Sequence, residues 1–221
     1  GENKFRFVAV DINDNSAVKE FVVRRIEFAD RPAVITVDNA PAIAAPDKTK
    51  LAVVFGIENY SYTAATVTHA VNDAEIVRQY FLKTLGVLPE NVYFKTSEKA
   101  TAAEFLKAFS SDGWLSRRVK PKESVVYVYY SGHGAPDPST KSSFLIPYDV
   151  DPNYPKAGGV DLADLYANLS KLNAKAVFVF LDACFTGETG RADKRDLILA
   201  DARGVTIVDK LQVPYPNLTI L

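Results

Sequence analysis

Two residues at the ends of apolar segments could together hydrolyse a carbonyl compound. His133, one of two histidines, follows the apolar run 125–130, and Cys184, the single cysteine, follows the apolar run 176–181 and lies 51 positions after the histidine. Cysteine attacks a carbonyl carbon as the thiolate, so it needs a neighbouring base, and histidine can supply one. The pair indicates a cysteine hydrolase.

Glycines accompany both residues. Gly132, Gly134 and Gly187 allow tight backbone turns because they lack a Cβ atom. We predict an oxyanion hole formed by the backbone N–H groups of Gly134 and Cys184. A free cysteine or a lone histidine is by itself more often a core residue. Their joint position at glycine-flanked strand ends is what favours catalysis.

The surrounding segments alternate between strands and helices. The continuous apolar runs are typical of strands buried on both faces of a parallel sheet. The repeated strand–helix–strand order predicts a doubly wound α/β sheet, in which sites lie at the carboxyl ends of strands. The expected strands are 51–57, 92–94, 125–130, 176–181 and 217–221, and the expected helices are 73–85, 101–109 and 162–172.

The N-terminal part of the chain has a different pattern. Residues 4–10 alternate in polarity and residues 18–28 read as a second strand, with turn-forming residues between them. We interpret residues 1–38 as a β-hairpin, the remnant of a truncated β-sandwich module. The Pro- and Ala-rich segment 39–49 predicts a linker, and residues 50–221 form the main domain.

Composition excludes several classes of function. The net charge of −1 gives no electrostatic basis for binding nucleic acid or an anionic membrane. No apolar run approaches the roughly 20 residues of a membrane span, so we expect a soluble protein. The compartment stays unknown: cytoplasmic, or periplasmic or secreted if a signal peptide was removed. One cysteine forms neither an intramolecular disulfide nor a zinc site of several cysteines.

The residues around the histidine and the cysteine resemble a known family. Residues 130–134 (YSGHG) and 182–187 (DACFTG) resemble the matching motifs of the caspase/metacaspase superfamily of cysteine peptidases. Residues 51–60 are similar to the first strand of that family, and residues 71–74 (VNDA) to the start of its first helix. The resemblance covers residues 50–221, close to the family's large subunit.

This resemblance implies a caspase-like fold of mostly parallel sheet flanked by helices. It implies a bacterial metacaspase-like cysteine endopeptidase that acts through a Cys184–His133 dyad and requires no metal or other cofactor. The expected partner is a peptide or protein substrate. The large-subunit region would be followed by an intersubunit linker and the strand after it, and a small-subunit segment would lie downstream.

Charge near the cysteine bears on which peptide bond is cut. Asp182 lies two residues before Cys184, where caspases that cut after Asp have Gln. A carboxylate at this position would repel an acidic P1 side chain and attract Arg or Lys. The resemblance to Arg/Lys-specific metacaspases also implies pocket roles for Asp73 and Ser131. The predicted S1 residues are therefore Asp73, Ser131 and Asp182.

Other residues with useful chemistry have weaker interpretations. His69 precedes the first expected helix and is interpreted as a surface histidine. Three tyrosines of one apolar strand are interpreted as core packing: Tyr127, Tyr129 and Tyr130.

Residues after the cysteine could be cut by the enzyme itself. Basic residues there are candidate autocleavage sites, although a charged run is more often a solvated loop. Calcium is left unassigned, because Arg191 occupies a position where the family has a calcium ligand. The autocleavage candidates are Arg191, Lys194, Arg195 and Arg203, and the oxygen ligands available to calcium are Asp149, Asp151, Asp161 and Asp164.

Three alternatives remain open. A non-proteolytic adaptor or scaffold could keep this fold, although such a protein has no physical need for both Cys184 and His133. A caspase-fold protease could prefer an acidic P1 residue. A different Cys–His hydrolase, such as an amidase, would be separated from a peptidase by a panel of amide and ester substrates.

Overall fold

The structure is a computed structural model that divides into two units, Gly1–Val37 and Asp38–Leu221. The expected linker and the sandwich origin of the N-terminal unit stay predictions. The residues that the structure describes are 2–10, 16–24, 36–137, 142–183, 185 and 215–221.

The N-terminal unit contains an antiparallel hairpin. Strand β1 (Glu2–Val10) pairs with β2 (Ser16–Arg24) in a register that runs from Glu2↔Arg24 to Val10↔Ser16. The second strand begins two residues earlier than the pattern predicts. Val18 and Val22 are exposed on it, at 47% and 53%. A two-stranded sheet with exposed valines buries little apolar surface, so the hairpin alone is marginally stable.

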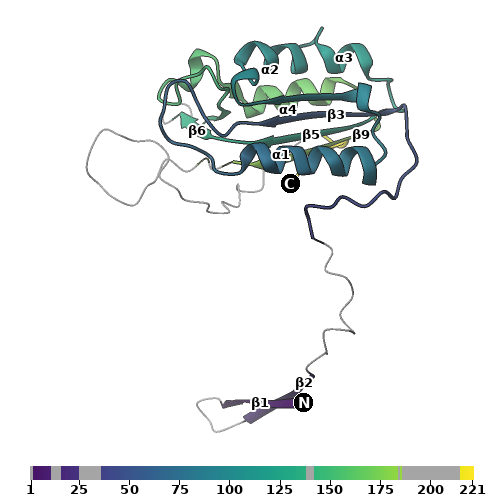
Figure 1. Cartoon of the computed structure of the whole chain (residues 1–221), viewed down its shortest axis with the longest axis vertical. Helices are drawn as coiled ribbons and strands as arrows, with labels where there is room; N and C mark the ends of the chain where they lie inside the picture. Colours follow the sequence, from purple (N-terminus) through teal and green to yellow (C-terminus); the bar gives the residue numbers. More distant parts are fainter. Residues whose placement is uncertain (1, 11–15, 25–35, 138–141, 184, 186–214) are drawn as a thin grey trace. The chain divides into compact units, whose positions relative to one another are not determined.

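Parallel strands build the main sheet of the second unit, as the apolar runs predict (Figure 1). Their order is β10, β9, β5, β3, β4, and every neighbouring pair is parallel. Strands β5 and β9 are therefore neighbours, and their carboxyl ends lie at the same edge. The strands are β3 (Lys50–Gly56), β4 (Val92–Thr96), β5 (Val125–Ser131), β9 (Ala176–Asp182) and β10 (Leu218–Ile220).

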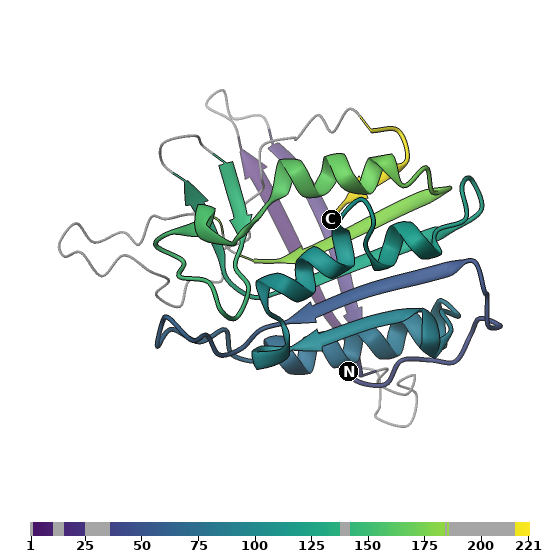
Figure 2. The ribbon, with the colours of Figure 1, turned by 90° about the horizontal axis from the view of Figure 1, so that it is seen from above.

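Helices cover both faces of this sheet. Helix α1 packs on one face, while α2, α3 and α4 pack on the other (Figures 1 and 2). The predicted α/β fold with a mostly parallel sheet is thus confirmed. The helices are α1 (Ala70–Gln79), α2 (Ala102–Phe109), α3 (Trp114–Arg118) and α4 (Leu162–Lys171), with short helical turns at Tyr80–Thr84, Pro89–Asn91, Ser97–Lys99 and Pro155–Ala157.

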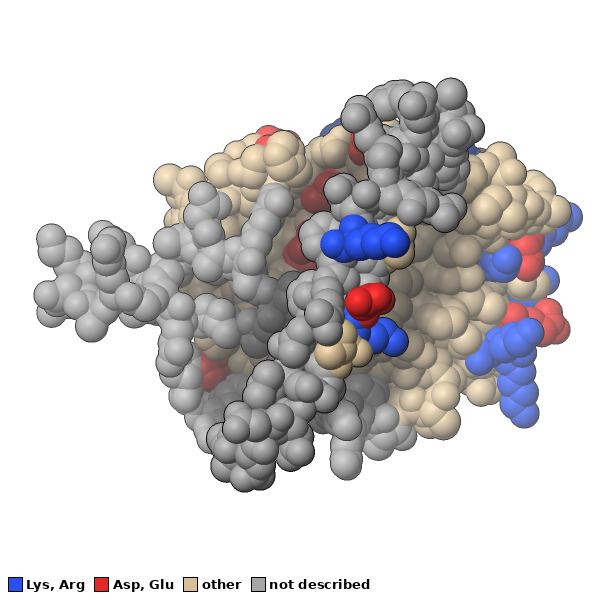
Figure 3. Space-filling view, turned by 90° about the horizontal axis from the view of Figure 1, so that it is seen from below, with Lys and Arg blue, Asp and Glu red and all other residues tan. Residues whose placement is uncertain are grey.

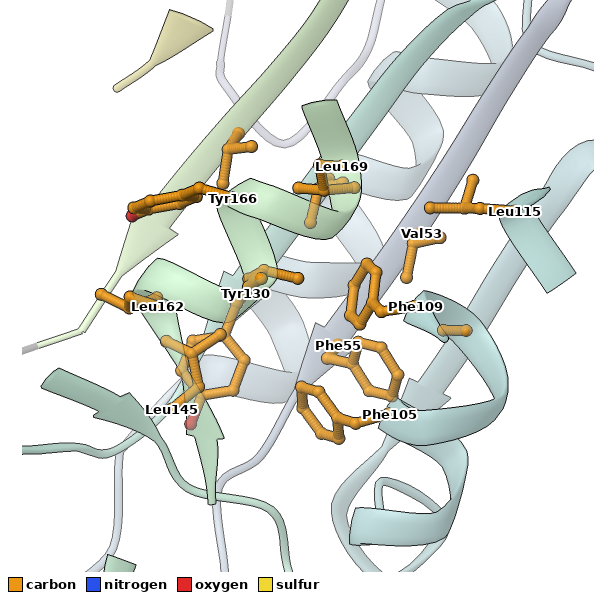
Figure 4. Close-up of a cluster of buried hydrophobic side chains, with 14 of the residues drawn as sticks. Val53, Phe55, Phe105, Phe109, Leu115, Tyr130, Leu145, Leu162, Tyr166 and Leu169 are labelled. Atoms are coloured by element: carbon orange, nitrogen blue, oxygen red, sulfur yellow. The ribbon is translucent and has the colours of Figure 1, made fainter. Parts of the chain in front are cut away.

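The larger core lies between the sheet and helices α2 to α4. Phe55 of β3 stacks on Phe105 of α2, with ring centroids 3.8 Å apart (Figure 4). Tyr130 of β5 meets Phe105 edge-on at 6.0 Å. These three side chains are at most 2% exposed. Because β3 and β5 are packed this tightly in the core, their carboxyl ends are held in place.

A second, smaller sheet was not predicted. Strands β6 (Gly134–Asp137), β7 (Ser142–Leu145) and β8 (Val160–Asp161) form an antiparallel sheet in the order β6, β7, β8. It lies at the carboxyl end of the main sheet (Figure 2). These strands are too short to give a clear period in the sequence. Strand β6 begins directly after His133, so this sheet fixes the chain on one side of the histidine.

Helix boundaries differ from prediction at the start of α1. The helix begins at Ala70, three residues before the expected start, and His69 precedes it with φ 74°. Gly86, with φ 75°, follows the turn at Tyr80–Thr84, as expected for a glycine that ends a helix. Helix α3 was also missed, because five residues are too few to show a helical period.

The described residues contain no helix long and apolar enough to cross a membrane. Among the described side chains visible in Figure 3, basic and acidic groups lie close to one another.

Glu104 of α2 lies at the centre of a charged cluster. Its carboxylate contacts the ammonium groups of Lys107 (2.5 Å) and Lys95 (2.9 Å) and accepts a hydrogen bond from the Tyr93 hydroxyl (2.6 Å). The bonds from Lys107, Tyr93 and Lys95, in that order, lower the pKa of Glu104 to about 2. A carboxylate with a depressed pKa stabilises the fold above its unfolded pKa, and this contribution is lost as the pH falls toward 2.

We therefore expect Glu104→Gln to lower the free energy of unfolding by about 1 kcal/mol at pH 7. The difference from wild type should shrink between pH 4.5 and pH 2, as urea unfolding at several pH values would measure. The matched control is Glu98→Gln, which changes an exposed carboxylate nearby. A constant difference down to pH 2 would contradict this role of the charge.

Candidate functional site

The site is built on the carboxyl ends of β5 and β9. Their register pairs Ser131 with Asp182, and the Gly132 N–H donates to the Asp182 carbonyl at 3.2 Å. His133 lies two residues beyond Ser131, and position 184 lies two residues beyond Asp182. The register therefore ends both strands at the same level, as the parallel sheet predicts.

His133 is enclosed by the chain that leaves β3. Its side chain is buried, with 5% of the residue exposed. The imidazole ring stacks on Tyr60, with centroids 4.5 Å apart and planes 28° apart. The imidazole Nε2 atom lies 3.1 Å from the carbonyl oxygen of Ala65. Two residues between β3 and α1 thus hold the ring.

The Ala65 contact fixes the tautomer of His133. A carbonyl oxygen only accepts hydrogen bonds, so Nε2 carries the proton in the neutral ring and Nδ1 keeps its lone pair. Burial lowers the pKa of His133, and the bond to Ala65 partly offsets this because it favours the protonated form. The ring is therefore neutral at neutral pH, with Nδ1 able to accept a proton.

Gly134 has a backbone N–H that β7 does not use. The Ile146 N–H donates to the His133 carbonyl at 3.0 Å. In an antiparallel ladder, this bond makes the facing pair Gly134↔Leu145 a non-hydrogen-bonded pair. The Gly134 N–H then points away from β7. This orientation is compatible with the predicted oxyanion donor, which stays a prediction.

Ser131 and Asp182 contact each other directly. The Ser131 hydroxyl donates to a carboxylate oxygen of Asp182 at 3.2 Å. Ser131 is fully buried, whereas Asp182 is exposed. The strand register thus brings two of the three predicted S1 residues together, with the carboxylate on the solvent side.

Asp73 approaches the same place from α1. It is half-buried in the first turn of the helix, where its N–H donates to the His69 carbonyl at 2.8 Å. The carboxylates of Asp73 and Asp182 both affect the pKa of the Tyr129 hydroxyl. Burial raises the pKa of Tyr129 to about 12, the charges of Asp182 and Asp73 add to this rise, and a hydrogen bond with Ser131 opposes it. The charges of Asp182 and Asp73 and the Ser131 hydroxyl therefore all act on the Tyr129 hydroxyl.

Gly56 allows α1 to approach the sheet edge. It faces Ser131 in the register of β3 and β5. A Cβ atom at Gly56 would lie 2.5 Å from the Ala74 Cβ and 2.6 Å from the Ala70 carbonyl oxygen. Only glycine fits there, because both obstacles are in the first turns of α1. The close packing sets the position of Asp73.

Cys184 lies outside the described residues. Its two neighbours, Ala183 and Phe185, are half-buried and pack against the larger core. The predicted autocleavage residues also lie outside the described part of the chain: Arg191, Lys194, Arg195 and Arg203.

Two of the acidic residues considered for calcium have other hydrogen-bond roles. Asp161 caps α4 by accepting from the N–H groups of Ala163 and Asp164, and Asp149 accepts from the N–H of Ala102 at 2.7 Å. Within the described residues, no group of three or more His, Cys, Asp or Glu side chains could hold a metal ion. Calcium stays unassigned.

Sequence reasoning missed several contributors to the site. Tyr129 and Tyr130 pack in the core as expected, but their hydroxyls also contact Ser131 and the His133 carbonyl, respectively. Tyr127 packs in the core as well, against Phe81 and Phe178. No sequence signal marks the Ala65 carbonyl, because a main-chain acceptor leaves no trace in residue type.

The fold and the position of His133 define an α/β protein with its site at the carboxyl edge of a parallel sheet. The family model described as the caspase domain matches residues 49–213. The chain therefore belongs to the caspase-domain family of cysteine-type peptidases.

Three individual proteins that resemble this chain are each 26% identical to it or less. Metacaspase-1 of Eremothecium gossypii is 26% identical over 151 residues, which are 62% of this chain and 31% of that protein. Among solved structures, the Drosophila initiator caspase Dronc is similar with TM-score 0.46 and 11% identity, covering 70% of this chain and 62% of that one. The structure titled pro-sf-caspase-1 gives TM-score 0.42 and 16% identity, covering 86% and 66%. The chain thus spans about a third of the metacaspase, and TM-scores below 0.5 do not establish a common fold.

Proposed function

We propose that the protein is a cysteine endopeptidase that cleaves after Arg or Lys through a Cys184–His133 dyad. The observation that carries the dyad is the Ala65 bond to Nε2 of His133, because it leaves Nδ1 as a proton acceptor at the edge where β9 ends. A non-proteolytic adaptor has no physical need for both Cys184 and a histidine whose Nδ1 can accept a proton. This argues against the adaptor alternative.

The proposed reaction uses Cys184 as the nucleophile and His133 as the base. His133 Nδ1 takes the thiol proton of Cys184, and the thiolate sulfur bonds to the peptide carbonyl carbon. The backbone N–H groups of Gly134 and Cys184 donate to the oxyanion. The C–N bond breaks as His133 protonates the leaving amine. Water, deprotonated by His133, then attacks the thioester and releases the acid and the free thiol.

The carboxylates account for the proposed specificity. Asp182 and Asp73 each raise the pKa of the Tyr129 hydroxyl through their negative charge, which supports a negatively charged pocket at this edge of the sheet. A bound Arg or Lys side chain would neutralise this charge, whereas an acidic side chain would be repelled. The charge supports a basic P1 residue over the acidic alternative. The bacterial-type assignment stays a prediction.

Two further features belong to the proposal. Among the described residues, β10 is an edge strand of the main sheet. A strand of a downstream small subunit could pair with its outer edge. Self-cleavage at Arg191, Lys194, Arg195 or Arg203 would follow from a basic P1 preference. Intact mass measurement of the incubated protein would detect it.

A digest of a denatured protein mixture tests the proposed function. We expect the new C-termini, mapped by mass spectrometry, to be Arg and Lys, and pretreatment with iodoacetamide to abolish cleavage. New C-termini that are mostly Asp would make the acidic-P1 alternative correct. Hydrolysis of simple amides or esters without peptide cleavage would favour the amidase alternative.

A further inference from the structure

The Tyr60 side chain makes two separate contacts with His133. Its hydroxyl accepts a hydrogen bond from the His133 backbone N–H at 2.6 Å. Its ring stacks on the imidazole at 4.5 Å. Tyr60 is 8% exposed. It follows β3, so it is far from His133 in the sequence. One residue therefore fixes both the main chain and the side chain of the histidine.

Tyr130 also contacts the main chain of His133, at its carbonyl oxygen. Its hydroxyl is 2.6 Å from the His133 carbonyl oxygen and 3.0 Å from the Ile146 carbonyl oxygen. Carbonyls only accept, so the Tyr130 hydroxyl donates and its oxygen can accept from the Tyr60 hydroxyl, 3.5 Å away. The two phenols thus link the N–H of His133 to its own carbonyl.

Both phenols stay neutral under working conditions. Burial raises the pKa of both Tyr60 and Tyr130. Neither hydroxyl loses its proton near neutral pH, so the chain of donors and acceptors persists.

Gly132 gives the two hydroxyls their space. A Cβ atom at Gly132 would lie 2.6 Å from the Tyr60 hydroxyl and 2.6 Å from the Tyr130 hydroxyl. The glycine before the histidine is therefore explained by the tyrosine pair as well as by the turn. The arrangement depends on all three residue types together.

We propose that Tyr60 is a positioning residue for the general base, holding His133 through a hydrogen bond to its N–H and a stack on its ring. The proposal rests on the proposed peptidase function. Without the hydroxyl, the buried N–H of His133 loses its acceptor, and the loop shifts or admits water to satisfy it. Even a small displacement of the base weakens proton transfer, because the reacting atoms must stay within hydrogen-bond reach.

Histidine NMR tests the positioning without relying on activity. The chain has two histidines, His69 and His133, so a His69→Gln variant assigns both signals. In wild type we expect the pKa of His133 to lie below the ordinary value of a histidine, because its ring is buried. The variant Tyr60→Phe keeps the ring and removes the hydroxyl. It should raise the midpoint of His133, because the loosened ring becomes more hydrated.

Kinetics supply the second readout. For an Arg-P1 peptide, Tyr60→Phe should lower kcat roughly tenfold or more, leave KM nearly unchanged, and move the acidic limb of kcat/KM to higher pH. Tyr130→Phe should act in the same direction. Tyr166→Phe is the matched control, because the structure shows no hydrogen bond or ring contact between this buried tyrosine of α4 and His133.

The outcomes separate the two proposals. If Tyr60→Phe leaves both the His133 titration and kcat as in Tyr166→Phe, the positioning role is wrong. If wild type cuts no Arg-P1 peptide but the His133 midpoint shifts as expected, the positioning stands and the proposed substrate class fails.

Discussion

Replacing Cys184 with alanine should abolish peptide cleavage, with a loss of at least ~10⁴-fold in kcat, because no other thiol is present to form the acyl intermediate. His133→Ala should reduce kcat by ~10²- to 10⁴-fold, since the thiol then lacks its base. Initial rates on an Arg-P1 peptide would measure both effects.

The matched control for the base is His69→Ala, which removes the other histidine from an exposed position at the start of α1. Its kcat should equal that of wild type. If His133→Ala keeps more than about a third of the wild-type rate, His133 is not the base. Cleavage that persists in Cys184→Ala would exclude the nucleophile itself.

Removing the charge of Asp182 should weaken cleavage after Arg. We expect Asp182→Asn to lower kcat/KM for an Arg-P1 peptide by roughly tenfold to a hundredfold, because an ion pair in the pocket is lost. The Ser131 hydroxyl can still donate to the amide oxygen, so the fold should be retained. Asp73→Asn should act in the same direction.

The matched control is Asp164→Asn, an exposed carboxylate of α4. It should leave the Arg-P1 rate unchanged. Steady-state rates on paired peptides with Arg, Gln or Asp at P1 give the comparison. An equal fall on all three peptides would show that Asp182 supports the fold of the site rather than the choice of substrate.

The framework of this site could be predicted from the sequence. The continuous apolar runs predicted strands β5 and β9. Because sites in parallel sheets lie at the carboxyl ends of strands, His133 was expected at that edge. The charge of Asp182 suggested a pocket, and in the structure Ser131 pairs with Asp182 in the strand register and donates to its carboxylate. These inferences succeed because buried strands leave continuous patterns in the sequence.

The contacts that orient His133 could not be predicted. The Ala65 carbonyl is a main-chain group, and Tyr60 lies more than 70 residues before the histidine it holds. Such contacts depend on how the chain leaves β3, which no periodicity encodes. Tyr129 and Tyr130 were correctly expected to be buried, but the sequence pattern gave no sign that the Tyr130 hydroxyl bonds to the His133 and Ile146 carbonyls.

Covalent labelling tests the central claim most directly. A peptidyl acyloxymethyl ketone with Arg at its reactive end is incubated with the complete protein, and the adduct is mapped by mass spectrometry. We predict one adduct per chain, on Cys184, formed at least ~10-fold faster than with the Asp reagent and slowed in His133→Ala. Faster reaction of the Asp reagent, or equal rates in wild type and His133→Ala, would contradict the account.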